Sequence, residues 1–243
     1  IGLAPGEVAP NLLLVGDPAR AERCSLKFDE LLGTYRNREY VTFTGRLNGM
    51  DLSVMATGIG CDNTEIALVE LGNILESANL IRVGTCGGLQ EDIEIGDLVI
   101  SWAALRMEIT SLQYVPEGYP AVAHPDISGA LLHSAKSLNI PHHFGMTATA
   151  SGFYAAQGRD LPGFPARKPE LEKDLQRLGI KNMEMESSTL FTLASLKGWK
   201  AGAVCTVFAN RIKNEFVDPA KKKELEDRAI DCGLAALEKL GAC

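Results

Sequence analysis

Strand-like apolar runs alternate with helix-like periodic segments along the whole chain, and this alternation restricts the possible folds. Strands are expected at 11–15, 40–47, 52–57, 80–84, 97–105, 144–150 and 201–209. Helices are expected at 64–75, 125–138, 170–178 and 187–197, and a last helix begins at Asp218-Pro219 with an apolar stripe of Ile230, Leu234 and Leu237. The alternation predicts an α/β protein whose sheet is rich in parallel strands.

Turn signals mark several boundaries in this pattern. Asn48-Gly49 between two expected strands is typical of an antiparallel hairpin. Gly16-Asp17-Pro18 follows strand 11–15, and Pro18 suits the first position of a helix. The Gly-rich segment 85–88 is expected to form a turn, and 152–169 an irregular loop, which in a compact domain is usually functional or mobile.

Composition favours one domain, 1–243, in a reduced and soluble cytoplasmic protein. A chain of 243 residues with 46% hydrophobic content can bury one large core, and no repeat or linker divides it. The net charge of −7 would repel a polyanion, which argues against nucleic-acid and anionic-membrane partners. No apolar run approaches the roughly 20 residues that span a bilayer, and no basic leader begins the chain. The six cysteines show no CxxC spacing, which favours free thiols.

The heptad FYAAQGR, Phe153 to Arg159, combines an aromatic face, a carboxamide and a guanidinium. The amide of Gln157 presents a donor beside an acceptor, so it can pair with the imide edge of uracil, and Arg159 can donate to a second carbonyl. The alternative for such a heptad taken alone is a solvated surface loop. The rest of the chain must therefore supply the context.

Three arginines lie near expected strand ends, where ligands of α/β sheets gather. Arg20 lies in the first turn of a helix, where a cation is disfavoured unless an anion answers it. Arg82 lies inside the apolar run LIRVG, just before Thr85, and its alternative is a buried structural ion pair. Arg38 alone would be an ordinary surface residue paired with Glu39.

The segment Glu184-Met185-Glu186 precedes the expected helix 187–197. A carboxylate can accept both hydrogen bonds of a ribose cis-diol, and a Met side chain can lie against the sugar. The alternative is that these acidic residues complement a helix N-terminus.

Together these residues resemble the nucleoside phosphorylases of the uridine and purine type. The resemblance covers nearly the whole chain and rests on the order and spacing of LLLVGDPARAERC, NREY, ATGIG, LIRVGTCGGLQEDIEIGDLVIS, SGFYAAQGR, NMEMESSTLF and FANR. It implies a three-layer α/β/α sandwich with a mixed, partly barrel-like central sheet. It also implies a homodimer with shared active sites, often assembled as three dimers in a hexamer.

The resemblance assigns roles by position. It implies a phosphate site of Gly16, Arg20, Arg82 and Thr85, completed by Arg38 from the neighbouring subunit. It implies ribose binding by Met185 and Glu186, with Glu184 beside them, and base binding by Phe153, Gln157 and Arg159. Family members usually present a histidine to the partner's ribose from just before the segment matching Ile1-Gly2-Leu3, and the resemblance assigns no residue of 1–243 to that contact. A monovalent cation site near Glu39 and Ile59 is incomplete because Asn63 replaces a serine.

The implied reaction is reversible phosphorolysis of uridine to uracil and ribose 1-phosphate, with phosphate as co-substrate and no metal or other cofactor. Arg82, Arg159, Gln157 and Glu186 are the expected catalytic residues. Purine-specific relatives place an Asp after the strand that here ends Ala209-Asn210-Arg211, and its absence favours a pyrimidine base. The alternatives are a purine nucleoside phosphorylase, a nucleosidase that uses water, and a nucleoside-binding protein without turnover. A dinucleotide-binding dehydrogenase is disfavoured because the GxGxxG spacing is missing.

Overall fold

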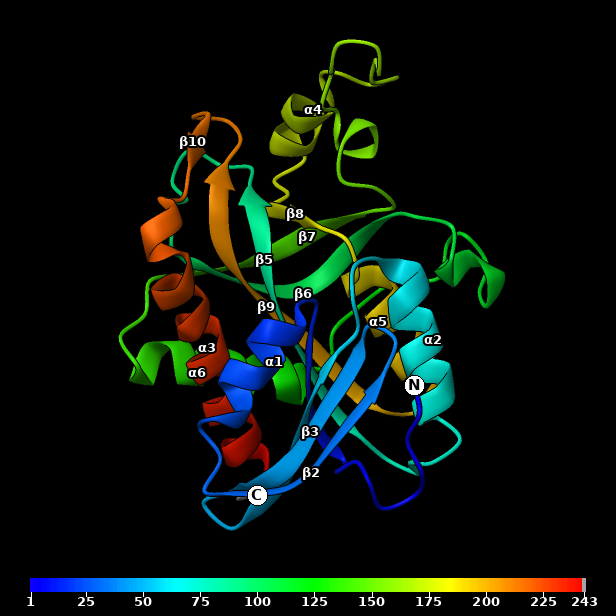
Figure 1. Ribbon diagram of the computed structural model, residues 1–243. Helices are drawn as coiled ribbons and strands as arrows, with labels where there is room; N and C mark the ends of the chain where they lie inside the picture. Colours follow the sequence, from blue (N-terminus) through cyan, green and yellow to red (C-terminus); the bar gives the residue numbers. More distant parts are fainter. Residues whose placement is uncertain (242–243) are drawn as a thin grey trace.

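A mixed sheet organises the molecule, for which a computed structural model describes residues 1–241. Its strands lie in the order β10-β9-β6-β7-β8-β5-β1-β4-β3-β2, and β5 also pairs with β9. This extra pairing closes β9, β6, β7, β8 and β5 into a small barrel, and β1 to β4 extend the sheet from its edge (Figure 1). The expected mixed, partly barrel-like sheet is therefore confirmed. The strands are β1 (Asn11–Val15), β2 (Glu30–Asn37), β3 (Tyr40–Leu47), β4 (Met50–Ala56), β5 (Asn79–Gly88), β6 (Leu98–Met107), β7 (His142–Ala150), β8 (Asn182–Glu184), β9 (Lys200–Asn210) and β10 (Glu215–Phe216).

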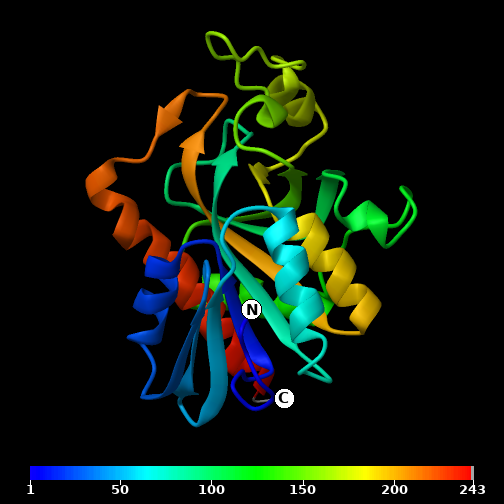
Figure 2. The same ribbon diagram turned by 45° about the vertical axis from the view of Figure 1, so that its right-hand side comes forward.

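Helices cover both faces of this sheet, as the expected three-layer sandwich requires. One group is α1 (Pro18–Ser25), α3 (Pro125–Ser137) and α6 (Lys222–Gly241), and the other is α2 (Cys61–Leu71) and α5 (Ser187–Lys197). Figures 1 and 2 show the two groups on opposite sides of the strands. The short α4 (Leu171–Arg177) lies apart, above the barrel, beside the loop 152–169.

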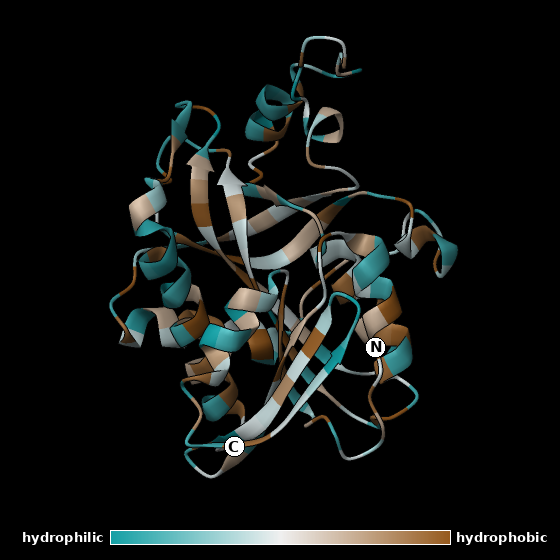
Figure 3. Ribbon diagram, in the orientation of Figure 1, coloured by the Kyte–Doolittle hydropathy of each residue, from teal (hydrophilic) through white to brown (hydrophobic). Residues whose placement is uncertain are grey.

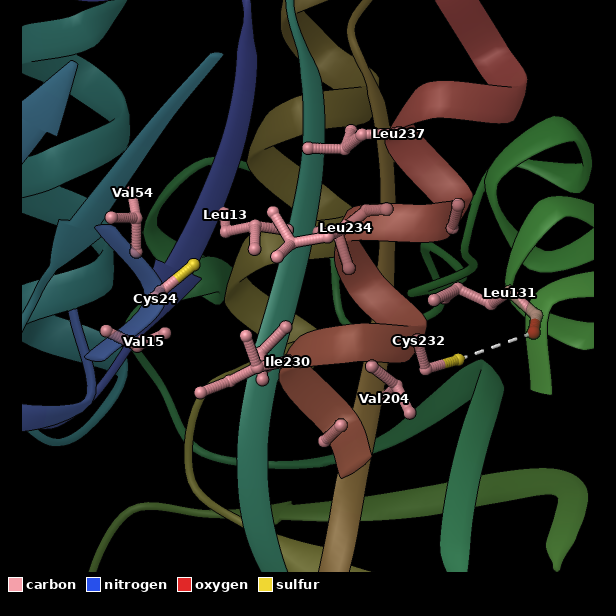
Figure 4. Packing of buried hydrophobic residues seen from close by; sticks show 14 of the residues in the cluster. Leu13, Val15, Cys24, Val54, Leu131, Val204, Ile230, Cys232, Leu234 and Leu237 are labelled. Atoms are coloured by element: carbon pink, nitrogen blue, oxygen red, sulfur yellow. Dashed lines mark hydrogen bonds between the residues drawn. The ribbon is translucent and has the colours of Figure 1, made fainter. Parts of the chain in front are cut away.

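Each helix layer has its own apolar core against the sheet. The predicted stripe of α6 is confirmed, because Ile230, Leu234 and Leu237 are all buried against strand residues such as Leu13 (Figure 4). The Cys232 thiol donates to the Leu131 carbonyl of α3 at 3.5 Å, which joins the two helices. Both apolar and polar residues occur along α2 and α6 in Figure 3, as in amphipathic helices.

Several sequence expectations hold at the level of single turns. The hairpin at Asn48-Gly49 joins β3 to β4, both residues having positive φ as this turn needs. Pro18 opens α1, which Asp17 caps by accepting a hydrogen bond from the Ala19 N–H at 2.9 Å. The last helix is preceded by a 3₁₀ turn, Pro219–Lys221, so the α-helix itself begins at Lys222.

The expected turn at 85–88 is wrong, because β5 continues through it to Gly88. The backbone there is paired on both sides, with β8 at Gly87 and Met183 and with β9 at Gly88 and Asn210. A Cβ on Gly87 would lie 3.1 Å from Cδ of Arg211, so glycine allows the close approach of its neighbours. Pairing on both sides outweighs the low strand propensity of glycine.

The strands β2, β8 and β10 carry no sequence signal that predicted them. β2 is an edge strand with mostly exposed residues, and the other two are very short.

None of the described helices combines the length and hydropathy needed to cross a bilayer. The parallel strands β1, β4, β5 and β9 end at one edge of the sheet, and this edge holds the candidate site.

Candidate active site

A cleft of about 870 Å³ opens at the carboxyl ends of the parallel strands. This volume lies within the range of small-molecule sites. All but one of the residues predicted for the site line it. They are Gly16, Arg20, Arg82, Thr85, Phe153, Gln157, Arg159, Glu184, Met185 and Glu186. Segments up to 170 residues apart in sequence are thus brought into one cavity.

Arg20 stands at one end of the cleft, beside the turn at Gly16. Its guanidinium is buried, and it donates to the Val83 carbonyl at 3.3 Å and to the Glu226 carboxylate at 2.8 Å. Its Nε is buried without a hydrogen-bond partner. A buried guanidinium with an unused donor is poised to accept an anion in the cleft.

Arg82 crosses the floor of the cleft between two carboxylates. Its Nε lies 2.9 Å from Oε2 of Glu184, and its Nη2 forms an ion pair with Glu186. Burial alone would lower the pKa of Arg82, but Glu186 and Glu184 outweigh it and raise that pKa. Arg82 is therefore a buried ion-pair partner, which was the alternative for this residue, and it also lines the cleft at the predicted phosphate site.

The two glutamates flanking Met185 occupy different environments. Besides Arg82, the Glu184 carboxylate accepts from the Thr149 hydroxyl at 2.6 Å and from the N–H groups of Glu186 and Ser187 at 2.9 Å. Its side chain is fully buried, and its hydrogen bonds hold the start of α5 in place. Glu184 thus complements a helix N-terminus, which was the structural alternative for this segment.

Glu186 has fewer partners within its own segment. Its Oε1 accepts from the Gly60 N–H at 2.7 Å, and Oε2 accepts from the Met185 N–H at 3.1 Å and pairs with Arg82. Burial raises the pKa of Glu186 despite the opposing effect of Arg82. The carboxylate lies on the cleft wall beside Met185, in a position where a sugar hydroxyl can reach it.

The loop 152–169, which carries the heptad FYAAQGR, lies at the side of the cleft away from α1 (Figures 1 and 2). Gln157 ends a 3₁₀ turn and is buried, while Phe153 is 51% exposed. The Arg159 guanidinium carbon lies 4.4 Å from the centre of the Phe153 ring, a cation–π contact. Nε of Arg159 is buried without a partner. Aromatic face, carboxamide and guanidinium thus line one cleft, and the solvated-surface alternative for this heptad is wrong for the buried Gln157.

Arg211 is a charged residue beside this end that sequence reasoning did not single out. It follows β9, donates to Glu172 at 2.7 Å and lies 3.6 Å from the Met183 sulfur. Burial first, and then the nearby Arg211, lower the pKa of Arg159. Two guanidinium groups so close together attract negative charge to this end. The available signal was its place directly after a strand that ends at the cleft.

Arg38 is the predicted site residue that lies outside the cleft. It is exposed in the turn between β2 and β3, with a φ of 55°. Glu39 is also exposed, and it approaches Asn63 at Gly58, where an added Cβ would lie 2.6 Å from Nδ2 of Asn63 and 3.2 Å from Cγ of Glu39. Ile59 and Asn63 line the cleft. Within residues 1–241 no three His, Cys, Asp or Glu side chains form a group that could hold a metal ion.

The cleft therefore has three parts. Arg20 from α1 and Arg82 offer positive charge, Met185 and Glu186 follow β8, and Gln157 and Arg159 come from the loop 152–169, on the far side of β8 from α1 (Figure 1). An anion, a polyhydroxylated ring and a planar ring with carbonyl groups match these parts in turn.

Known proteins resemble this chain over nearly its full length. Residues 11–240 match the family model described as "Phosphorylase superfamily". A uridine phosphorylase of Thermococcus kodakarensis is 46% identical over 227 residues, which cover 92% of this chain and 81% of that protein. A guanosine phosphorylase of Halorubrum lacusprofundi is 33% identical, over 93% of this chain and 89% of that protein. A solved structure, titled as a Trypanosoma brucei nucleoside phosphorylase that shows uridine phosphorylase activity, superposes with a TM-score of 0.91 at 26% identity, covering 96% of this chain and 94% of that one.

Proposed function

Because the chain belongs to the phosphorylase superfamily, we propose that its cleft catalyses the reversible phosphorolysis of uridine to uracil and ribose 1-phosphate. The observation that carries this proposal is that Gln157 and Arg159 line the same cleft as Arg20 and Arg82. This supports a binding mode in which a phosphate and a uracil ring lie on either side of a ribose.

The chemistry requires an anion near the sugar and donors at the leaving base. As the N-glycosidic bond breaks, positive charge develops on the ribosyl carbon and negative charge on the base. Arg20 and Arg82 hold phosphate, whose oxygen attacks the anomeric carbon of the ribose. Glu186 accepts hydrogen bonds from the ribose hydroxyls, with Met185 against the sugar. Glu184 acts through Arg82, since its own oxygens are engaged in hydrogen bonds inside the protein.

Uracil leaves as an anion, and the base end of the cleft is suited to it. Gln157 pairs with the imide edge, while Arg159 donates to a carbonyl on which charge accumulates. Arg211 adds a second positive charge nearby. Phosphate is the co-substrate, and the proposed mechanism needs no cofactor.

A purine substrate is the second candidate, because one relative is a guanosine phosphorylase. A purine leaving group benefits from protonation of its imidazole nitrogen, which needs an acid near the base. The strand that would supply this acid, β9, ends in Asn210, which is buried. The next residue is Arg211, and the nearby carboxylate of Glu172 is engaged in an ion pair with it. This arrangement favours the pyrimidine.

The assembly and the compartment form part of the same proposal. Arg38 is exposed and lies outside its own cleft, which supports the proposal that it completes the phosphate site of a partner copy in a homodimer. The described cysteines, Cys24, Cys61, Cys86, Cys205 and Cys232, are all buried and free, and Cys243 lies outside the described residues. Free thiols are typical of a reducing compartment, which supports the cytoplasm.

One experiment separates these functions. The protein is incubated with uridine or with inosine, with and without inorganic phosphate, and the free base is measured. We expect uracil to appear only when phosphate is present. Release from inosine alone would identify a purine enzyme, release without phosphate a nucleosidase, and no release a binding protein.

A further inference from the structure

Lys222 lines the cleft at the end that holds Arg20. It is the first residue of α6, and it shares this wall with Gly16, Asp17 and Val217. All three lysines, Lys221 to Lys223, are exposed, but neither Lys221 nor Lys223 lines the cleft. Of three consecutive cations, only the central one therefore lies at the site.

Two carboxylates lie four residues from Lys222, and both have other partners. Asp218 caps the 3₁₀ turn by accepting from the Ala220 N–H at 3.0 Å. Glu226 lies four residues along α6, on the same helix face. It accepts from Arg20 at 2.8 Å and forms an ion pair with Arg23 as well. Asp17, on the same wall, caps α1 through the Ala19 N–H. Among the described residues, Lys222 forms no ion pair or hydrogen bond with its ammonium group.

The position of Lys222 is unfavourable for the helix. The N-terminus of a helix carries partial positive charge and favours anions, so a lysine in the first position opposes the dipole. A cation that opposes its own helix and lacks a carboxylate partner is stabilised when an anion binds beside it. Residues that break a local rule in this way are often functional.

We propose that Lys222 is a further phosphate-binding residue of the cleft, which draws in the anionic co-substrate and holds it together with Arg20. This inference rests on the proposed function, because it takes phosphate as the anion. Phosphate carries close to two negative charges, and an ammonium group contacts it as a point charge.

The test compares Lys222→Gln with the matched control Lys223→Gln, which removes the same charge from the next residue of α6. We expect Lys222→Gln to raise KM for phosphate by about 1.5- to 5-fold, the range for an exposed charge pair. KM for uridine should stay within about 2-fold of the wild-type value, and so should kcat at saturating phosphate, since the lost contact is to ground state and transition state alike. Lys223→Gln should leave KM for phosphate unchanged.

A second measurement does not depend on turnover. Inorganic phosphate should raise the Tm of the wild-type protein, by more at higher phosphate concentration and for tighter binding. At the same phosphate concentration, this rise should be smaller for Lys222→Gln. Without phosphate, the Tm of Lys222→Gln should equal or exceed that of the wild type, because a cation leaves the helix N-terminus. If the wild type failed to cleave uridine, the proposed function would be wrong, and the phosphate-dependent Tm would still test Lys222.

Two results would overturn the inference. One is a KM for phosphate and a phosphate-dependent Tm rise that are the same in Lys222→Gln as in the wild type. The other is an equal loss in Lys223→Gln, which would indicate general surface charge rather than a contact in the cleft.

Discussion

Nε of Arg82 donates to Oε2 of Glu184 at 2.9 Å, and neither side chain is more than 8% exposed. The pair joins the middle of β5 to the end of β8, just before α5 and 102 residues further along the chain. Since Arg82 also pairs with Glu186 on the cleft wall, one buried guanidinium connects the packing of the fold with the proposed phosphate and ribose sites.

Replacement of Glu184 with Gln should therefore destabilise the protein as a whole. The variant keeps the shape of the side chain but removes the negative charge that compensates Arg82 and that accepts from the N–H groups of Glu186 and Ser187. Loss of one partner of a buried pair costs about 3–5 kcal/mol. Urea unfolding should show a decrease of at least about 3 kcal/mol in the free energy of unfolding. A decrease below about 1 kcal/mol would contradict the role of Glu184.

Arg159→Ala should mainly impair the reaction. The substitution removes a charge-assisted hydrogen bond to the leaving base, worth about 1.5–3 kcal/mol, which corresponds to about 10- to 150-fold in kcat/KM for uridine. Arg167→Ala serves as a control, because Arg167 is exposed in the same loop and does not line the cleft. Steady-state phosphorolysis of uridine measures both variants. An undiminished rate in Arg159→Ala would count against its role.

The backbone at Gly158 holds Gln157 and Arg159 in place, and it leaves no room for a side chain. Gly158 has a φ of 75°, and an added Cβ would lie 2.9 Å from the Lys168 carbonyl oxygen. Gly163, in the same loop, has a φ of 79° but open space around it. Both Ala variants take on the cost of a left-handed conformation, about 1–2 kcal/mol, but only Gly158→Ala must also shift the backbone. We expect KM for uridine to rise about 10-fold in Gly158→Ala only, and a similar rise in both variants would refute the argument.

Local chemistry explains what could be predicted from the sequence. The turn at Gly16-Asp17-Pro18 and the apolar stripe of α6 follow from the properties of a few adjacent residues, and the structure has both. The 3.6-residue and two-residue periods distinguish helices from buried strands in the same way. The resemblance to a known family, based on the order of the motifs, then assigned segments that are distant in sequence to one predicted site.

Partners distant in sequence explain what could not be predicted. Nothing near Arg20 indicates that Glu226, 206 residues away, will pair with it. The continuation of β5 through Gly87 depends on β8 and β9, which follow about 100 residues later. From the sequence, Arg82 could be either a structural ion-pair partner or a ligand-binding residue. The structure shows that it pairs with Glu184 and Glu186 and also lines the cleft.

Uridine affinity should depend on pH through Glu186. Burial raises the pKa of this carboxyl group, so it takes up a proton at a higher pH than an ordinary glutamate, whose pKa is 4.5. As the pH falls through this raised pKa, the carboxylate that accepts from the ribose is lost, and affinity should decrease. Calorimetric titration with uridine in the absence of phosphate avoids the ionisation of phosphate itself. Glu186→Gln should bind more weakly and without this acid limb, and an identical pH profile in the variant would exclude Glu186 as its source.

Asn210→Asp should fail to create a purine enzyme, because Asn210 is structural. The Nδ2 group of Asn210 donates to the Gln90 carbonyl at 2.9 Å and to the Ile93 carbonyl at 2.8 Å, while its Oδ1 accepts from the Ile212 and Lys213 N–H groups. An aspartate in this buried position cannot donate, and it places a carboxylate oxygen against two carbonyl oxygens. Each unsatisfied buried group costs about 1–3 kcal/mol.

We therefore expect Asn210→Asp to lower the free energy of unfolding by at least about 2 kcal/mol in urea, with no gain in release of hypoxanthine from inosine. Asn214→Asp is the matched control, since Asn214 is exposed in the loop that follows. Phosphate-dependent cleavage of inosine by Asn210→Asp, at unchanged stability, would show that the side chain faces the base. The pyrimidine preference would then depend on this one amide rather than on Gln157 and Arg159.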